Sequence, residues 1–249
     1  RLATRGKRAT IAAWKIRDTR HHGRSGMIRR RDFLVATTGA VLVGCGAGAP
    51  GRDNGFIPVE NPEFARYVAA LNDKARGLGV PERVLRQAFD GIGFLPGVVT
   101  RDRNQAETSR TLEDYLALTV PDRRVTAGRG RRARNADMLA AIAARHGVDA
   151  DTLVALRGIE TAYGERRGSI PVIGATATLA FEGRRRRLFE AQLLDALRIL
   201  EAGDVTAARL TGSWAGAMGH TQLMPTTYRR YATDFDADGR RDIWGDNPA

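Results

Sequence analysis

The chain has 249 residues, 43% of them hydrophobic, and a formal net charge of +12 at pH 7. Such a length and apolar content suffice for a folded domain, while a strong positive charge first suggests a nucleic-acid partner. The charge is concentrated at the start, because residues 1–26 carry eight Lys or Arg against one Asp and residues 27–44 carry three against one. The remainder is only mildly basic. We therefore expect no nucleic-acid binding, while a mild positive bias remains compatible with an anionic polymer.

The first 45 residues have the order of an export signal. Residues 1–26 are basic and lack apolar periodicity, so we interpret them as upstream, non-native or disordered sequence. Residues 27–45 then run from a Met through three Arg to an apolar stretch and end at Cys45, which is the order of a signal peptide and its cleavage site. The apolar stretch is about eleven residues, too short to cross a bilayer as a helix. A buried core helix is the alternative.

Two short motifs sharpen this interpretation. Arg30-Arg31-Asp32-Phe33-Leu34 resembles a twin-arginine export signal, and Leu42-Val43-Gly44-Cys45 resembles the lipobox of bacterial lipoproteins. We expect lipidation at Cys45, although a lone buried thiol is the simpler alternative. Because Cys45 is the only cysteine, no intramolecular disulfide can form.

Residues 46–57 are rich in Gly, Ala, Pro and polar residues, which predicts a flexible tether. The fold is expected to begin near Pro58, and Asn61-Pro62 predicts the start of a helix that continues to Gly77. Further helices are expected around 81–90, 110–118, 134–146, 149–163, 188–202 and 225–232. The sequence shows no extended alternation typical of strands and no obvious repeat. We therefore predict one mainly helical domain over residues 58–249, arranged around a cleft.

Glu160 is the carboxyl group that the helical pattern singles out. At 100° per residue, it falls between Leu153 and Leu156 on the apolar side of the helix, while Arg157 and Thr161 fall on the other side. Apolar surroundings disfavour the charged form of a carboxyl and raise its pKa, which keeps a general acid protonated near neutral pH. A buried Glu that pairs with an Arg for structural reasons alone is an equal alternative on this evidence.

Two segments carry a family resemblance. Gly158-Ile-Glu-Thr-Ala-Tyr-Gly164 resembles the catalytic-glutamate segment of the membrane-bound lytic transglycosylase B family. Gly212-Ser-Trp-Ala-Gly-Ala-Met-Gly-His-Thr-Gln-Leu-Met-Pro-Thr-Thr-Tyr228 is similar to the most distinctive motif of the same family. The resemblance covers roughly residues 60–249. It departs from the family at Arg157, where Trp is usual, and at Leu223, where Phe is common.

The resemblance implies a lysozyme-like helical domain with an N-terminal helical extension. It also implies an enzyme that cuts peptidoglycan between N-acetylmuramic acid and N-acetylglucosamine. Glu160 would act first as the acid and then as the base, while the muramyl 6-hydroxyl attacks its own anomeric carbon and leaves a 1,6-anhydro sugar. No second carboxylate is needed, because no water is activated and no carboxylate nucleophile takes part. No cofactor is required.

The resemblance also carries substrate-binding roles. Ser213 and Gln222 match positions that line the sugar subsites, with turn chemistry in a Gly-rich loop as the alternative. Arg184 and Arg185 match a pair that reaches the glycan or its acidic peptide, with a solvated basic helix start as the alternative. Tyr163 could stack in the cleft, although its place in the apolar stripe favours the core.

An acidic loop follows the second segment. Asp234, Asp236, Asp238 and Arg240 occupy positions one, three, five and seven of a calcium-loop pattern, and Gly239 occupies position six. Position twelve is Gly245 instead of the usual Glu. We expect either a structural calcium site or a tight acidic turn.

The resemblance finally bears on location and completeness. We expect an exported lipoprotein at the periplasmic face of the outer membrane, which binds glycan strands and takes part in cell-wall synthesis complexes. The family's catalytic domain normally continues beyond the acidic loop, so we expect the C-terminal part to be missing from this chain. A wall-binding scaffold that has lost turnover is the alternative to an enzyme, and a water-using muramidase is a lesser one.

Overall fold

The computed structural model describes residues 54–104 and 111–246. The predicted signal peptide, Cys45 and most of the predicted tether lie outside these residues. Within the described part, no helix combines the length and apolar character needed to cross a membrane.

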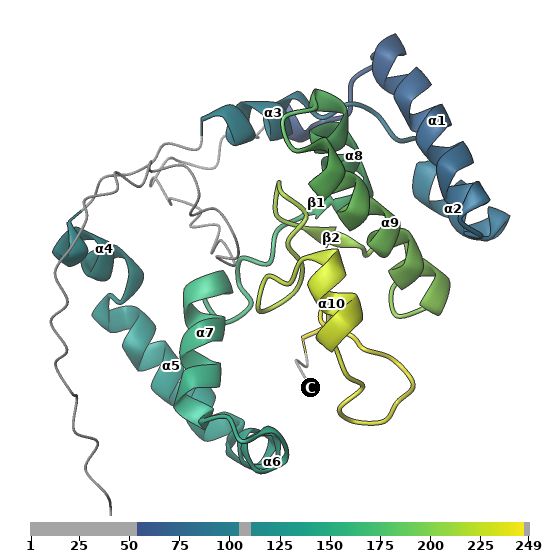
Figure 1. The fold of residues 1–249 in the computed structure, drawn as a ribbon. Coiled ribbons are helices and arrows are strands. Elements are labelled where there is room, and N and C mark those ends of the chain that lie inside the picture. Colours follow the sequence, from purple (N-terminus) through teal and green to yellow (C-terminus); the bar gives the residue numbers. More distant parts are fainter. Residues whose placement is uncertain (1–53, 105–110, 247–249) are drawn as a thin grey trace, which may run out of the picture. The chain divides into compact units, whose positions relative to one another are not determined.

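The described residues are mainly helical, as predicted (Figure 1). The helices, in chain order, are η1 (Asn54–Phe56), α1 (Pro62–Gly77), α2 (Glu82–Phe89), α3 (Pro96–Arg103), α4 (Leu112–Thr119), α5 (Asp122–Arg134), α6 (Ala136–His146), α7 (Ala150–Thr161), α8 (Val172–Glu182), α9 (Arg186–Ala202) and α10 (Pro225–Tyr231). Two short strands, β1 (Ile170–Pro171) and β2 (Thr211–Gly212), form the only named sheet of this part.

The first long helix, α1, begins as the sequence predicts. The Asn61 side chain accepts a hydrogen bond from the backbone N–H of Phe64 at 2.9 Å, and Pro62 occupies the first helical position. Residues Phe64, Val68, Leu71 and Ala75 are buried at helical spacing. The described fold begins slightly earlier, because η1 contacts α3 within the last residues of the predicted tether.

Helices α8 and α9 form the centre of the hydrophobic core, packed against one another, with α1, α2 and α10 around them. Every residue of α8 from Val172 to Ala180 is buried. The hydroxyl of Thr176 donates to the backbone carbonyl of Val172 at 2.7 Å, so this buried hydroxyl is satisfied within the helix. Three α-helices, α3, α5 and α8, were not predicted from the sequence, and neither was the short helix η1.

A second group of helices, α5, α6 and α7, packs among itself and carries Glu160 near the end of α7. The side chain of Asp149 caps α7 by accepting from the N–H of Thr152 at 3.0 Å, and Asp151 places a second acid in the first turn, where the helix dipole favours negative charge. The chain then passes into β1, which pairs antiparallel with β2. This pairing brings the segment after α7 beside the glycine-rich loop that follows β2.

Candidate active site

Glu160 is the next-to-last residue of α7, and its side chain is half-buried. Among the described residues, no hydrogen bond or ion pair to its carboxyl group is found. Burial raises the pKa of Glu160 above its ordinary value, in the direction that the sequence predicts. The alternative of a Glu paired with an Arg for structural reasons therefore has no support in this part of the chain.

The predicted orientation of α7 is wrong. Its buried residues are Gly158 and Thr161, whereas Leu156 and Ile159 are 45% and 38% exposed. The helical projection counted large apolar side chains as the buried side, but α7 is packed through a glycine and a hydrogen-bonded threonine. Glu160 consequently loses hydration at the edge of the packed side and not within a stripe of leucines.

The turn after Glu160 is held by side-chain hydrogen bonds. Thr161 Oγ1 donates to the backbone carbonyl of His220 at 2.7 Å and accepts from the N–H of Gly164 at 2.9 Å. Ala162 and Tyr163 both have left-handed backbone conformations, with φ of 51° and 64°. Non-glycine residues rarely adopt this region, and such strain persists only where surrounding contacts enforce it.

Tyr163 lies in the core and not in an open cleft. It is 7% exposed, and its hydroxyl donates to the backbone carbonyl of Arg124 in α5 at 2.8 Å. Its ring fills the space that side chains at Gly128 and Gly158 would occupy. These contacts favour the core role that the sequence left open.

The glycine-rich loop is packed tightly against the segment that follows α7. A side chain at Gly168 would collide with the Gly212 carbonyl, and one at Gly212 would collide with the Ala217 carbonyl. Isolated bridges from Met218 to Gly212 and to Leu223 fold the loop back on itself.

Ser213 and Gln222, the two predicted sugar-binding residues, both belong to this loop. Ser213 is buried, and its Oγ accepts from the N–H of Ala217 at 3.1 Å. Gln222 is half-buried with φ of 52°, and its Nε2 donates to the carbonyls of Arg167 and Gly219 at 3.1 and 3.0 Å. These bonds are turn chemistry. They leave the Ser213 hydroxyl hydrogen and the Gln222 carbonyl oxygen for another partner.

His220 is a site residue that the sequence analysis missed. It is 6% exposed, its Nδ1 accepts from Arg157 Nε at 3.1 Å, and its Nε2 lies 2.8 Å from the carbonyl oxygen of Gly245. Burial first, then the positive charges of Arg157 and Arg167, lower the pKa of His220. Its contacts with Arg157 before Glu160 and with Gly245 after the acidic loop could not be predicted from sequence spacing.

Arg184 and Arg185 are held together by one buried acid. Asp102 of α3 is 2% exposed and forms ion pairs with both guanidinium groups, at 2.6 Å for Arg184. Arg184 Nη2 also donates to the Asp102 carbonyl at 3.0 Å. The two side chains remain 52% and 38% exposed, and two cations against one carboxylate leave an excess positive charge. The alternative of a merely solvated helix start does not account for this pairing.

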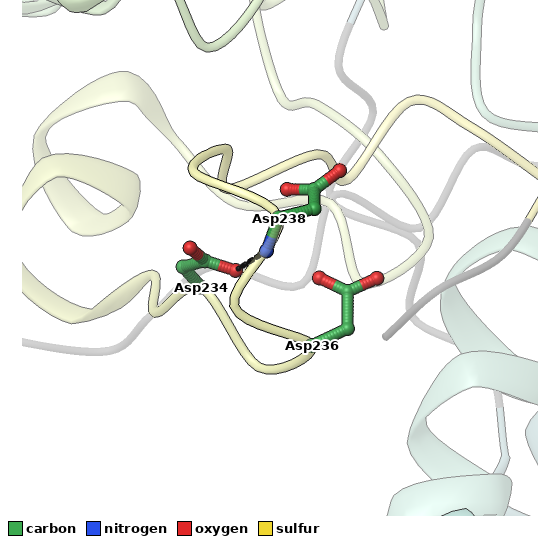
Figure 2. A group of neighbouring side chains, drawn as sticks. All are labelled: Asp234, Asp236 and Asp238. Carbon is green, nitrogen blue, oxygen red and sulfur yellow. Dashed lines mark hydrogen bonds between the residues drawn. The ribbon is translucent and has the colours of Figure 1, made fainter.

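The acidic loop brings its three aspartates together (Figure 2). Ligand oxygens of Asp234, Asp236 and Asp238 lie within 4.8 Å of one another. Asp234 already accepts from the N–H groups of Asp238 and Gly239, at 3.2 and 2.9 Å. Arg240, the fourth predicted position, is exposed, and Gly245 at position twelve offers no side-chain ligand. A divalent cation would therefore find three carboxylates in an open loop.

The site thus joins a hydrogen-bonded turn to a packed loop through Thr161 and His220, and the neighbouring Glu160 carboxyl has no partner among the described residues. A carboxyl group with a raised pKa can donate a proton and afterwards accept one.

Comparisons with known proteins identify the family of this chain. The family model described as Transglycosylase SLT domain matches residues 63–249. The membrane-bound lytic murein transglycosylase B of Escherichia coli (strain K12) is 37% identical over 100 residues, which are 40% of this chain and 28% of that protein.

Solved structures extend the likeness to most of the described fold. SltB3 from Pseudomonas aeruginosa, solved in complex with NAG-NAM-pentapeptide, is 45% identical with a TM-score of 0.73, over 76% of this chain and 50% of that one. The Escherichia coli lytic transglycosylase Slt35, solved in complex with calcium, is 27% identical with a TM-score of 0.63, over 74% and 58%. The chain spans about half the length of these solved relatives.

Proposed function

Because this chain belongs to the Transglycosylase SLT domain family and has the mainly helical, lysozyme-like fold of the lytic murein transglycosylases, we propose that it cleaves peptidoglycan with Glu160 as its acid and base. The bond cut is the β-1,4 link between N-acetylmuramic acid and N-acetylglucosamine, and the product is a 1,6-anhydromuramyl end.

One observation carries this proposal: Glu160 is half-buried, has a raised pKa and is without an ionic partner among the described residues. An acid that is to protonate a glycosidic oxygen must hold its proton near neutral pH, and desolvation supplies that condition.

The reaction proceeds in two proton transfers. Glu160 donates its proton to the glycosidic oxygen as the bond from that oxygen to the muramyl anomeric carbon breaks. The sugar then carries an oxocarbenium-like charge, which the ionised Glu160 and nearby polar groups stabilise. Glu160 next removes the proton of the muramyl 6-hydroxyl while O6 attacks the anomeric carbon. The ring closes, the carboxyl regains its proton, and no water is consumed.

Substrate binding is assigned to groups that keep unused hydrogen-bonding capacity. The Ser213 hydroxyl hydrogen and the Gln222 side-chain oxygen would bind sugar groups beside Glu160. Arg184 and Arg185 would bind an acidic group of the glycan or its peptide with their excess positive charge. Tyr163 contributes indirectly, because it supports the turn after Glu160 from within the core.

The acidic loop is proposed as a structural calcium site. Calcium prefers six to eight oxygen ligands, and this loop offers Asp234, Asp236 and Asp238 with the Arg240 backbone carbonyl, but no acid at position twelve. The residues fit a weak site completed by water. Calcium bound there would neutralise three mutually repelling carboxylates and stabilise the loop, while catalysis itself needs no cofactor.

The location proposed is the periplasmic face of the outer membrane, with a lipid anchor at Cys45. The relative from Escherichia coli is named as membrane-bound, and the motifs ending at Cys45 have the order of a lipoprotein signal. At that place the protein would reach glycan strands and cell-wall synthesis complexes. Labelling with a fatty-acid analogue tests this, and label that persists in Cys45→Ser contradicts it.

The function is tested by digesting purified sacculi and identifying the products by mass spectrometry. We expect anhydromuramyl products from the wild-type chain and a loss of about 100- to 10,000-fold in Glu160→Gln, the range for removal of a general acid. The matched control is Glu165→Gln, because Glu165 is an exposed acid just beyond the turn. Reducing ends would indicate a water-using muramidase, and binding without products would indicate a scaffold. Either result contradicts the proposal.

A further inference from the structure

His220 connects the turn after Glu160 to two other segments of the chain. Its Nδ1 accepts from Arg157 Nε at 3.1 Å, its Nε2 lies 2.8 Å from the Gly245 carbonyl oxygen, and its own carbonyl accepts from Thr161 Oγ1 at 2.7 Å. A side chain at Gly164 would come within 2.5 Å of the imidazole. The imidazole therefore contacts α7, the turn that follows it and the segment after the acidic loop.

These partners determine which imidazole nitrogen carries the proton. A guanidinium N–H can only donate, so Nδ1 must accept from Arg157 and cannot itself be protonated. The Gly245 carbonyl can only accept, so Nε2 carries the proton and donates to it. Arg167 Nη1, although 3.2 Å from Nε2, donates instead to the carbonyls of Trp244 and Gly245 at 3.0 and 2.6 Å. With a neutral ring protonated at Nε2, both the Arg157 N–H and the Gly245 carbonyl have a hydrogen-bond partner.

A second proton on His220 would break this arrangement. It would place an N–H on Nδ1 directly opposite the Arg157 Nε–H and remove the one acceptor that the described residues provide for this donor. The charged groups that face the ring are Arg157 from α7, Arg167 from the following segment and Asp246 near the end of the described chain. Arg131 of α5 and Tyr163 line a cavity together with His220. These three guanidinium groups outweigh the two carboxylates near them, because Asp246 is fully exposed and Glu165, which pairs with Arg131 at 3.8 Å, is 69% exposed.

We propose that neutral His220 is a positioning residue that holds the end of α7, and with it Glu160, in the reactive geometry. The inference rests on the proposed function. The active form then requires a neutral His220 together with a protonated Glu160. Activity should decline on the acidic side when His220 gains its second proton, and on the alkaline side when Glu160 loses its own.

Two substitutions separate the proton of His220 from its role as an acceptor. In His220→Asn, Oδ1 lies near the place of Nδ1 and can accept from Arg157, but the amide does not titrate. We expect this variant to keep most of kcat near neutral pH and to lose the acidic decline. His220→Leu removes the acceptor, and misplacement of a reacting group by about 1 Å can cost about 100-fold in rate, so we expect that loss in kcat with KM little changed. The control is His146→Asn, because His146 is an exposed histidine at the end of α6.

Nuclear magnetic resonance gives a readout that does not need turnover. In ¹⁵N-labelled protein, we expect His220 to show an unprotonated Nδ1 and a protonated Nε2 at neutral pH, and the amide signals of residues 158–164 to shift at the same midpoint as the imidazole. If the wild-type chain gives no products at any pH, the proposed function is contradicted. The resonance signals do not depend on turnover, so they test the positioning role in that case as well. The positioning role would be overturned by any of three results. These are a protonated Nδ1 at neutral pH, amide signals that do not shift as the imidazole titrates, and an acidic decline in activity that remains in His220→Asn.

Discussion

The ring of Tyr163 lies against the backbone of Gly158, so close that a Cβ built on this glycine would come within 2.7 Å of Cζ and of the hydroxyl oxygen. The same ring blocks a side chain at Gly128 on the facing helix. One aromatic side chain thus sets the spacing of α5 and α7, and the two glycines are the positions that make room for it.

Gly158→Ala and Gly128→Ala should both destabilise the protein, although alanine favours helices. The added methyl must displace the Tyr163 ring and strain its bond to the Arg124 carbonyl, and overpacking of this kind costs about 1–3 kcal/mol. Urea unfolding measures the loss. The control is Gly130→Ala on the same helix, where the nearest atom is the flexible end of Arg134 at 3.3 Å. It should stabilise by about 0.5–1 kcal/mol.

The sign of the effect identifies its cause. In a Tyr163→Ala background the obstacle is gone, so Gly158→Ala should become stabilising, as it is on an ordinary helix. A Gly158→Ala substitution that destabilises equally in both backgrounds would show that the ring is not the reason for the glycine.

A helix is easiest to predict from sequence when it has one buried side and a recognisable start. Helix α1 shows both, because its buried residues recur at helical spacing after the Asn61 cap. Helix α8 shows neither, because every residue from Val172 to Ala180 is buried and no side chain caps its start. Helix α5 was missed because it carries two glycines and many arginines, and its packing depends on a tyrosine outside it.

The site was predicted only as far as local motifs reach. The segments around Glu160 and from Gly212 to Tyr228 were recognisable as sequence, and the pKa of Glu160 shifts in the predicted direction. The partners of these segments are set by the fold instead. His220 lies 59 residues from Thr161, and Asp102 lies 82 residues from Arg184. No spacing rule relates residues that far apart.

Glu160 should make both activity and stability depend on pH. Burial raises its pKa above the ordinary value of 4.5, so the reactive protonated form is lost as pH rises through the folded-state pKa. The folded state also binds this proton more tightly than the unfolded state, so the associated stability is present below the unfolded pKa and is lost over the same rise. Glu160→Gln stays neutral, and its free energy of unfolding relative to wild type should therefore be higher at pH 8 than at pH 4. The outcome that contradicts this is a difference that does not change with pH in urea titrations.

Calcium should raise the midpoint of thermal unfolding through the acidic loop. A ligand at one hundred times its Kd stabilises by about 2.7 kcal/mol if it binds only the folded state. Asp236→Asn removes one carboxylate without touching the bonds that Asp234 makes within the loop, so it should reduce the shift. Magnesium, which demands a more regular shell of ligands, serves as the control ion and should give a smaller shift. A calcium shift that is unchanged in Asp236→Asn would place the ion elsewhere.

Asp102 should destabilise the protein when both of its arginine partners are removed together. With Arg184→Ala and Arg185→Ala combined, the carboxylate stays in a place that is 2% exposed but has lost both ion pairs. Breaking a buried pair in this way costs about 3–5 kcal/mol, and we expect about 2–3 kcal/mol because the guanidinium groups are half-exposed. Adding Asp102→Asn to the double variant removes the unpaired charge and should recover part of the loss, as measured by urea unfolding. The matched control is Asp73→Asn, an exposed acid paired with Arg76, which should change stability by less than about 1 kcal/mol. If the triple variant is no more stable than the double, the charge of Asp102 is not what the arginines compensate.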